Sequence, residues 1–136
     1  YRQRVLADRQ RRFDSSPATL AMTAVALTDA SKGWPALKAI QHARYLEGSD
    51  VTSPSLLASL LETLGLNAAA SMVRDPDEAL ISANASRMGR ARVLMQEFGV
   101  SGVPQLILHA DAKRTLLSLS AAYSNPSALL NQLQAA

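Results

Sequence analysis

The sequence predicts a mostly α-helical protein with one β-hairpin near its C-terminal end. Proline stands at the expected first turn of a helix at five places, and only two short apolar segments near residue 110 have the composition of strands. With 136 residues, 48% of them hydrophobic, the chain has the size of one domain, or of a piece of one, with a buried core. Aromatic residues make up only 4% of the chain, so we expect that core to be aliphatic.

Proline, capping residues and glycine set the expected helices. A basic helix is expected at about 2–13, followed by a helix at each of the ranges 17–31, 35–47, 54–64, 76–98 and 126–135, with a short turn near 68–73. Side chains that can cap a helix N-terminus precede four of the prolines: Ser16, Ser53, Asp75 and Asn125. Glycine stands where four helices are expected to stop: Gly33, Gly48, Gly65 and Gly99.

Two helices carry a recognisable apolar stripe. Leucines at helical spacing predict one buried face for the helix at 54–64, at positions 56, 57, 60, 61 and 64. Ile40, Ala43 and the position Leu46/Glu47 indicate the same for the helix before it. Asp75 with Glu78 resembles a capping box. We expect Trp34 to be a packing residue.

The strands are expected at 105–109 and 114–119, joined by a polar turn at 110–113. A two-stranded hairpin is marginally stable by itself, so it needs helices or further strands against it. Pro104 stands directly before the first strand, whereas the other prolines begin helices. Proline cannot donate a hydrogen bond to a neighbouring strand. Two interpretations of Pro104 remain: a trans proline at the start of an edge strand, or a cis proline that shapes a tight turn.

Composition and motifs exclude several kinds of site. The net charge of +3 owes much to arginines at 2, 4, 9, 11 and 12, but no aromatic residue is interleaved with them, which favours a solvated helix face over nucleic acid binding. No apolar segment has the length of a membrane span. The two histidines, His42 and His109, lack a third metal ligand at suitable spacing, and there is no cysteine. We therefore expect no metal, cofactor, nucleic acid or membrane partner.

Five segments, taken in order, resemble the DsbA-like thiol–disulfide oxidoreductases, in particular the protein disulfide isomerase group related to FrnE-type proteins. The first, at 13–18, resembles the entry into the helical insertion of that family, and the second, at 39–51, resembles its A-I-Q-x-A-x-Y-x-E-x-x-D segment. The third, at 64–66, resembles the end of the next helix, and the fourth, at 98–104, resembles the loop x-G-V-x-G-x-P. The fifth, at 122–123, resembles a late G-Y before the last helix.

The resemblance implies a thioredoxin fold interrupted by helices. Residues 1–98 would be the helical insertion, and residues 99–136 the strand–strand–helix half of an α/β parent whose Cys-x-x-Cys segment is missing. By the same resemblance, Val103 and Pro104 form a cis-proline loop that offers backbone groups to a substrate peptide, and we expect Gly102 to give the loop its turn. The apolar Val103 side chain cannot donate a hydrogen bond to a thiolate. By the resemblance, we therefore do not expect the missing cysteine pair to be strongly oxidising.

The leading interpretation is a fragment of a protein disulfide oxidoreductase or isomerase, inactive by itself because disulfide exchange requires a thiolate. Its partners would be protein or peptide thiols and disulfides. One alternative is a glutathione-dependent transferase or isomerase of the kappa type, in which a serine can replace the cysteine pair. Another is a non-enzymatic helical interaction module. If the chain folds alone, we expect it to dimerise through the exposed hairpin edge. The resemblance favours the bacterial cytoplasm.

Overall fold

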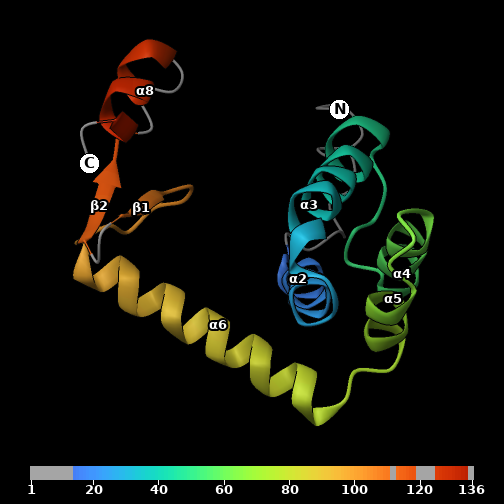
Figure 1. The fold of residues 1–136 in the computed structure, drawn as a ribbon. Coiled ribbons are helices and arrows are strands. Elements are labelled where there is room, and N and C mark those ends of the chain that lie inside the picture. Colours follow the sequence, from blue (N-terminus) through green and yellow to red (C-terminus); the bar gives the residue numbers. More distant parts are fainter. Residues whose placement is uncertain (1–13, 111–112, 119–124, 135–136) are drawn as a thin grey trace. The chain divides into compact units, whose positions relative to one another are not determined.

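The computed structural model describes residues 14–110, 113–118 and 125–134, which Figure 1 shows in colour. The expected helix at 2–13, part of the hairpin turn and the pair Ala122–Tyr123, which resembles the G-Y of the family, lie outside these residues. The chain divides into two compact units, Tyr1–Gly89 and Arg90–Ala136. Each unit is described by itself.

The first unit is entirely helical in its described part. Its α-helices are, in order, α2 (Ser16–Thr28), α3 (Gly33–His42), α4 (Pro54–Thr63), α5 (Asn67–Arg74) and the first part of α6 (Glu78–Glu97). A 3₁₀ turn at Ala30–Lys32 and a π-helix at Ala43–Glu47 flank α3. Helices α4 and α5 lie side by side, and α2 packs against α3, α4 and α5 (Figure 1).

The core of this unit is aliphatic, as the composition predicts. Its largest fully buried side chains are those of Leu57, Leu61, Leu80, Val25 and Thr23. Alanine fills much of the remaining space, which allows the short helices to approach closely: Ala21, Ala24, Ala36, Ala43, Ala58, Ala69 and Ala70. The predicted leucine stripe is confirmed at its centre by Leu57 and Leu61, which are both 0% exposed.

Two of the predicted caps are confirmed and two are wrong, because Ser16 is the first residue of α2 and not its cap. Ser53 and Asn125 accept hydrogen bonds from the backbone three residues later, at 3.4 and 3.2 Å. Asp75 instead ends α5, and the residue that caps α6 is Asp77, whose carboxylate accepts a bond from the Leu80 N–H at 2.8 Å. Because α5 extends to Arg74, α6 begins at Glu78, two residues later than expected. The capping box of Asp75 with Glu78 therefore does not form.

Four further expectations need correction. The segment expected as a short turn near 68–73 is the helix α5, whose Ala69, Ala70 and Val73 are buried against the core. Gly33 does not stop a helix but begins α3, with φ of −55°. Leu46 is 73% exposed, because a π-helix departs from α-helical spacing. Trp34 is 68% exposed and is not a core residue.

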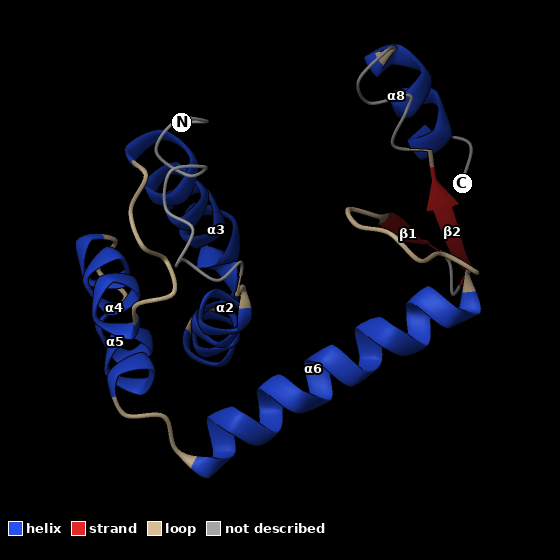
Figure 2. Ribbon diagram, turned by 180° about the vertical axis from the view of Figure 1, so that it is seen from behind, coloured by secondary structure: helices blue, strands red, loops and turns tan. Residues whose placement is uncertain are grey.

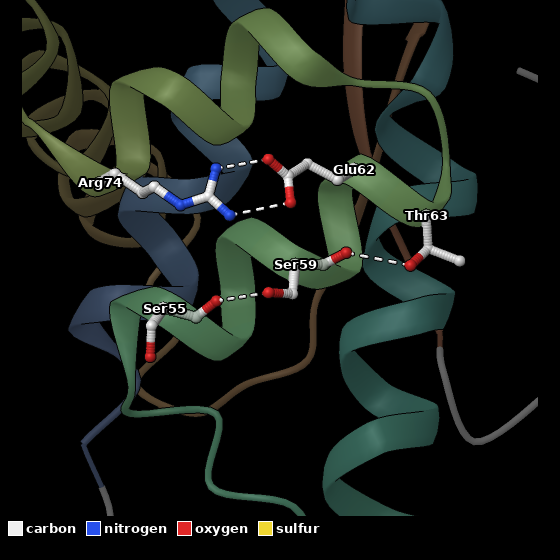
Figure 3. Close-up of polar contacts among 5 residues, drawn as sticks. All are labelled: Ser55, Ser59, Glu62, Thr63 and Arg74. Atoms are coloured by element: carbon white, nitrogen blue, oxygen red, sulfur yellow. Dashed lines mark hydrogen bonds and ion pairs between the residues drawn. The ribbon is translucent and has the colours of Figure 1, made fainter.

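The α4–α5 pair is joined on its surface by polar contacts, which Figure 3 shows. The Arg74 guanidinium donates to both carboxylate oxygens of Glu62, one of them at 2.8 Å. On the same helix as Glu62, Ser59 and Thr63 each donate to a carbonyl one turn earlier. The hydrogen bond from Arg74 lowers the pKa of Glu62, so the contribution of this pair is present near neutral pH and is lost on acidification. The pair is exposed, and its effect on stability is therefore small.

The second unit contains the end of α6, the hairpin and the last helix. Strands β1 (Leu106–Ala110) and β2 (Lys113–Leu117) pair antiparallel, with Leu106 opposite Leu117 and Ala110 opposite Lys113 (Figure 2). Helix α8 is Pro126–Gln134, and its Gln132 accepts a hydrogen bond from the Ser118 N–H at 3.0 Å. The predicted fold class, mostly α with one hairpin, is confirmed.

Candidate functional site

The candidate site is the loop that joins α6 to β1, and its first end is fixed by the way α6 stops. Gly99 has a left-handed φ of 62°, which glycine adopts without the steric penalty of a side chain. The Gly99 N–H donates to the Gln96 carbonyl at 3.1 Å, and the Val100 N–H donates to the Met95 carbonyl at 2.9 Å. These two bonds form a Schellman motif, so the chain leaves the helix in a defined direction.

An ion pair connects the helix end to the hairpin. Arg114 on β2 donates to the carboxylate of Glu97, the last residue of α6, at 2.6 Å. Arg114 lies opposite His109 in the register of the hairpin. Both ends of the loop therefore belong to elements that contact each other, although an exposed pair of this kind adds little stability.

The loop itself presents its residues to solvent. Every residue from 101 to 106 is exposed, and Val103 is 82% exposed. The peptide bond between Val103 and Pro104 is cis. A Cβ built at Gly102 would meet nothing within 4 Å, so open space lies beside the main chain there. The arrangement offers an apolar side chain and accessible backbone to a ligand.

The three predicted site residues, Gly102, Val103 and Pro104, are consecutive and lie together in this loop. The expected reason for glycine at 102 is not visible in the backbone, because Gly102 is not among the glycines with positive φ. The sequence analysis missed Gln105, whose side-chain amide donates to the Gly102 carbonyl at 3.0 Å. No motif marks this residue, since the bond depends on the path of the loop.

The histidines are not brought into a site. His42, the last residue of α3, lies 3.1 Å from the carboxylate of Glu47, the last residue of the π-helix, and His109 lies on β1. Within 14–110, 113–118 and 125–134, no group of three or more histidine, aspartate or glutamate side chains is placed to hold a metal ion. The described helices include none that combines the length and the apolarity needed to cross a membrane.

No family model and no curated protein matches the sequence. The fold, however, matches the structure of the cytosolic disulfide reductase DsbM from Pseudomonas aeruginosa, with a TM-score of 0.77 and 30% identity over 97% of this chain. The structure of that reductase with GSH gives a TM-score of 0.76 and 28% identity over 96% of this chain. The chain is related to the DsbA-like thiol–disulfide oxidoreductases.

The DsbA-like relationship extends over nearly the whole chain but not over the whole of its relatives. The chain spans 65% of the length of the DsbM structure and 62% of the structure with GSH. A protein from Nitrosomonas europaea that is assigned as a disulfide isomerase shares the fold, with a TM-score of 0.69 and 23% identity, over 90% of this chain and 60% of that one. The matches to DsbM support the relationship to the DsbA-like oxidoreductases that the sequence predicts.

Proposed function

We propose that this chain is the helical insertion, 1–98, and the strand–strand–helix part, 99–136, of a DsbA-like disulfide reductase or isomerase. The observation that carries the proposal is the match to a disulfide reductase over 97% of this chain at a TM-score of 0.77. The chain contains no cysteine and spans 65% of that structure. In this proposal, the redox cysteine pair lies in a segment that this sequence does not contain.

The proposed reaction is thiol–disulfide exchange. A thiolate of the pair attacks one sulfur of a substrate disulfide, and the other substrate sulfur leaves as a thiolate. The second cysteine then attacks the mixed disulfide, so the substrate gains two electrons and the pair becomes a disulfide. Two thiols of the glutathione class then restore the dithiol by two further exchanges and are themselves joined in a disulfide. This choice of reductant is supported by the GSH in one of the DsbM structures.

In this proposal, the chain contributes the surface that holds the substrate. Gly102 leaves room beside the main chain, Val103 presents an apolar side chain, and Pro104 continues the loop toward β1. A protein or peptide disulfide would lie extended along these residues. DsbM is a cytosolic protein, which supports a cytoplasmic location for this oxidoreductase as well.

The first test is to sequence the gene upstream of the Tyr1 codon and to assay the encoded protein. We expect an apolar strand followed by Cys-x-x-Cys at a helix start, and reduction of a disulfide peptide with GSH as the reductant. The 136-residue chain alone serves as the negative control, because it lacks a thiolate. A lone serine in place of the pair would favour the glutathione transferase alternative. A start codon just before Tyr1 would leave only the helical interaction module.

The role of the loop is tested by Val103→Asp in the full-length protein. The side chain is 82% exposed, so we expect the thermal midpoint to stay close to that of the wild type. A charge at the centre of an apolar contact is expected to lower kcat/KM for a disulfide peptide by about fivefold or more. Val93→Asp, on a helix residue that is 60% exposed, is the control. Equal effects of the two changes would argue against the loop as the substrate surface.

We also propose that the isolated chain dimerises through its hairpin. Strands β1 and β2 pair only with each other within the described residues, so each has an open edge that a second copy could extend. Light scattering of the 136-residue chain is expected to give twice the monomer mass, 29 kDa from two chains of 14.5 kDa. A strictly monomeric chain at high concentration would refute this.

A further inference from the structure

Gln105 is the last residue of the candidate loop, and its side chain reaches back to the main chain of the same loop. Its side-chain Nε2 donates to the Gly102 carbonyl oxygen at 3.0 Å, which closes a ring around Val103 and Pro104. Within the described residues, this is the only hydrogen bond that joins two residues of the segment 101–105. Within this segment, that side-chain bond is the one hydrogen bond that holds the described loop residues to each other.

Val103, inside the ring that this bond closes, is 82% exposed. Neither the N–H nor the C=O of Val103 has a hydrogen-bond partner among the described residues. Beside it, a Cβ at Gly102 would meet nothing within 4 Å. An extended peptide can pair with exposed backbone groups of this kind as an added strand would, provided that those groups keep a fixed direction. Fixing them in advance removes part of the entropy cost of binding.

We propose that Gln105 is a positioning residue of the substrate loop. Its amide holds the Gly102 carbonyl and thereby fixes the backbone of Val103 in the direction that a substrate peptide pairs with. The inference rests on the proposed function and adds a distinction between substrates. A peptide disulfide needs the aligned backbone, whereas a small aromatic disulfide without peptide groups does not.

The test compares three substitutions at this position in the full-length oxidoreductase. Gln105→Met keeps the length and loses the donor, Gln105→Glu replaces the donor with an acceptor, and Gln105→Lys keeps a donor of similar reach. Loss of one hydrogen bond is expected to raise KM for a disulfide peptide about 3- to 10-fold in the Met and Glu variants, with kcat within about twofold of the wild type. The Lys variant is expected to have a KM close to that of the wild type.

Two controls separate positioning from general damage. Gln96→Met makes the same chemical change at an exposed position on α6, where the Gln96 side chain has no hydrogen bond among the described residues, and it should leave KM unchanged. Reduction of 5,5′-dithiobis(2-nitrobenzoate), an aromatic disulfide, should proceed at the wild-type rate in all variants. We expect the thermal midpoint to change little, because Gln105 is exposed.

The outcomes are distinguishable. A wild-type protein that reduces neither substrate overturns the proposed function and this inference together. A wild-type protein that is active, with Met and Glu variants that keep the wild-type KM for the peptide, overturns the inference alone. Equal losses on the peptide and on the aromatic disulfide would also overturn it, because they would indicate a structural role for Gln105.

Discussion

Replacing Leu61 by alanine is expected to lower the free energy of unfolding of the helical unit by about 2–5 kcal/mol. The Leu61 side chain is 0% exposed and is among the largest in the core. It lies on α4, which packs against both α5 and α2, and it belongs to the core cluster that these helices share. Neighbouring side chains include many alanines, which have no rotamers with which to fill the space.

The measurement is urea unfolding followed by circular dichroism at 222 nm. Leu27→Ala is the matched control, because Leu27 lies on α2 and is 53% exposed. The same truncation there is expected to cost less than about 1 kcal/mol. A loss at Leu61 no larger than the loss at Leu27 would contradict the central place of Leu61 in the core.

Local signals along the sequence account well for the helices that begin at a proline. The Ser53–Pro54 pair predicts the start of α4, and the leucines that follow predict its buried face, because both depend on residues within one or two turns. Asn125 similarly predicts the start of α8. These predictions require no knowledge of what the helix packs against.

Helix α5 shows where this reasoning fails. Its eight residues, Asn67–Arg74, are too few to form a stable helix alone and have no proline at the start, so the segment was expected to be a turn. Packing of Ala69, Ala70 and Val73 against the core stabilises it, and that packing is a property of the whole unit. Once α5 extends to Arg74, Asp75 can no longer cap α6, and Asp77 takes that role.

The candidate site divides in the same way. Glycine and proline in the segment 98–104 are local signals. They contribute to the resemblance to the DsbA-like family, and the structural match to DsbM agrees with it. The contacts of Gln105 and of the Glu97–Arg114 pair depend on how the chain returns on itself between α6 and the hairpin. Residue type gives no indication of such contacts.

A polar contact between α2 and α6 could not be predicted from the sequence either. Thr23 is 0% exposed, and its hydroxyl lies 2.8 Å from the Asn84 side-chain oxygen and 3.0 Å from the Thr19 carbonyl oxygen. Arg87 donates to the same hydroxyl at 3.3 Å and to the Met22 carbonyl at 3.0 Å. The hydroxyl has one proton, so it donates to one of the two oxygens at a time and accepts from Arg87.

Thr23→Val is expected to lower the free energy of unfolding by about 1–3 kcal/mol, because the methyl group fits but removes the donor to the Asn84 oxygen and one of the two acceptors of Arg87. Thr28→Val is the control on the same helix, since Thr28 is an exposed residue whose hydroxyl, within the described residues, bonds only carbonyls of α2, at 2.9 and 3.4 Å. Its cost is expected within about 0.5 kcal/mol. Equal costs in urea unfolding would mean that the contact to α6 adds nothing.

The double variant Thr23→Val with Asn84→Leu separates loss of the bond from loss of packing. Replacing both members of a buried hydrogen bond with apolar groups of similar shape can be nearly neutral. Removing one member leaves the other without a hydrogen-bond partner, which costs free energy. We therefore expect the double variant to be more stable than Thr23→Val alone, with a coupling energy of about 0.5–3 kcal/mol. Additive losses would instead mean that Asn84 and Thr23 act independently, and that burial alone explains the sensitivity of α2 at this position.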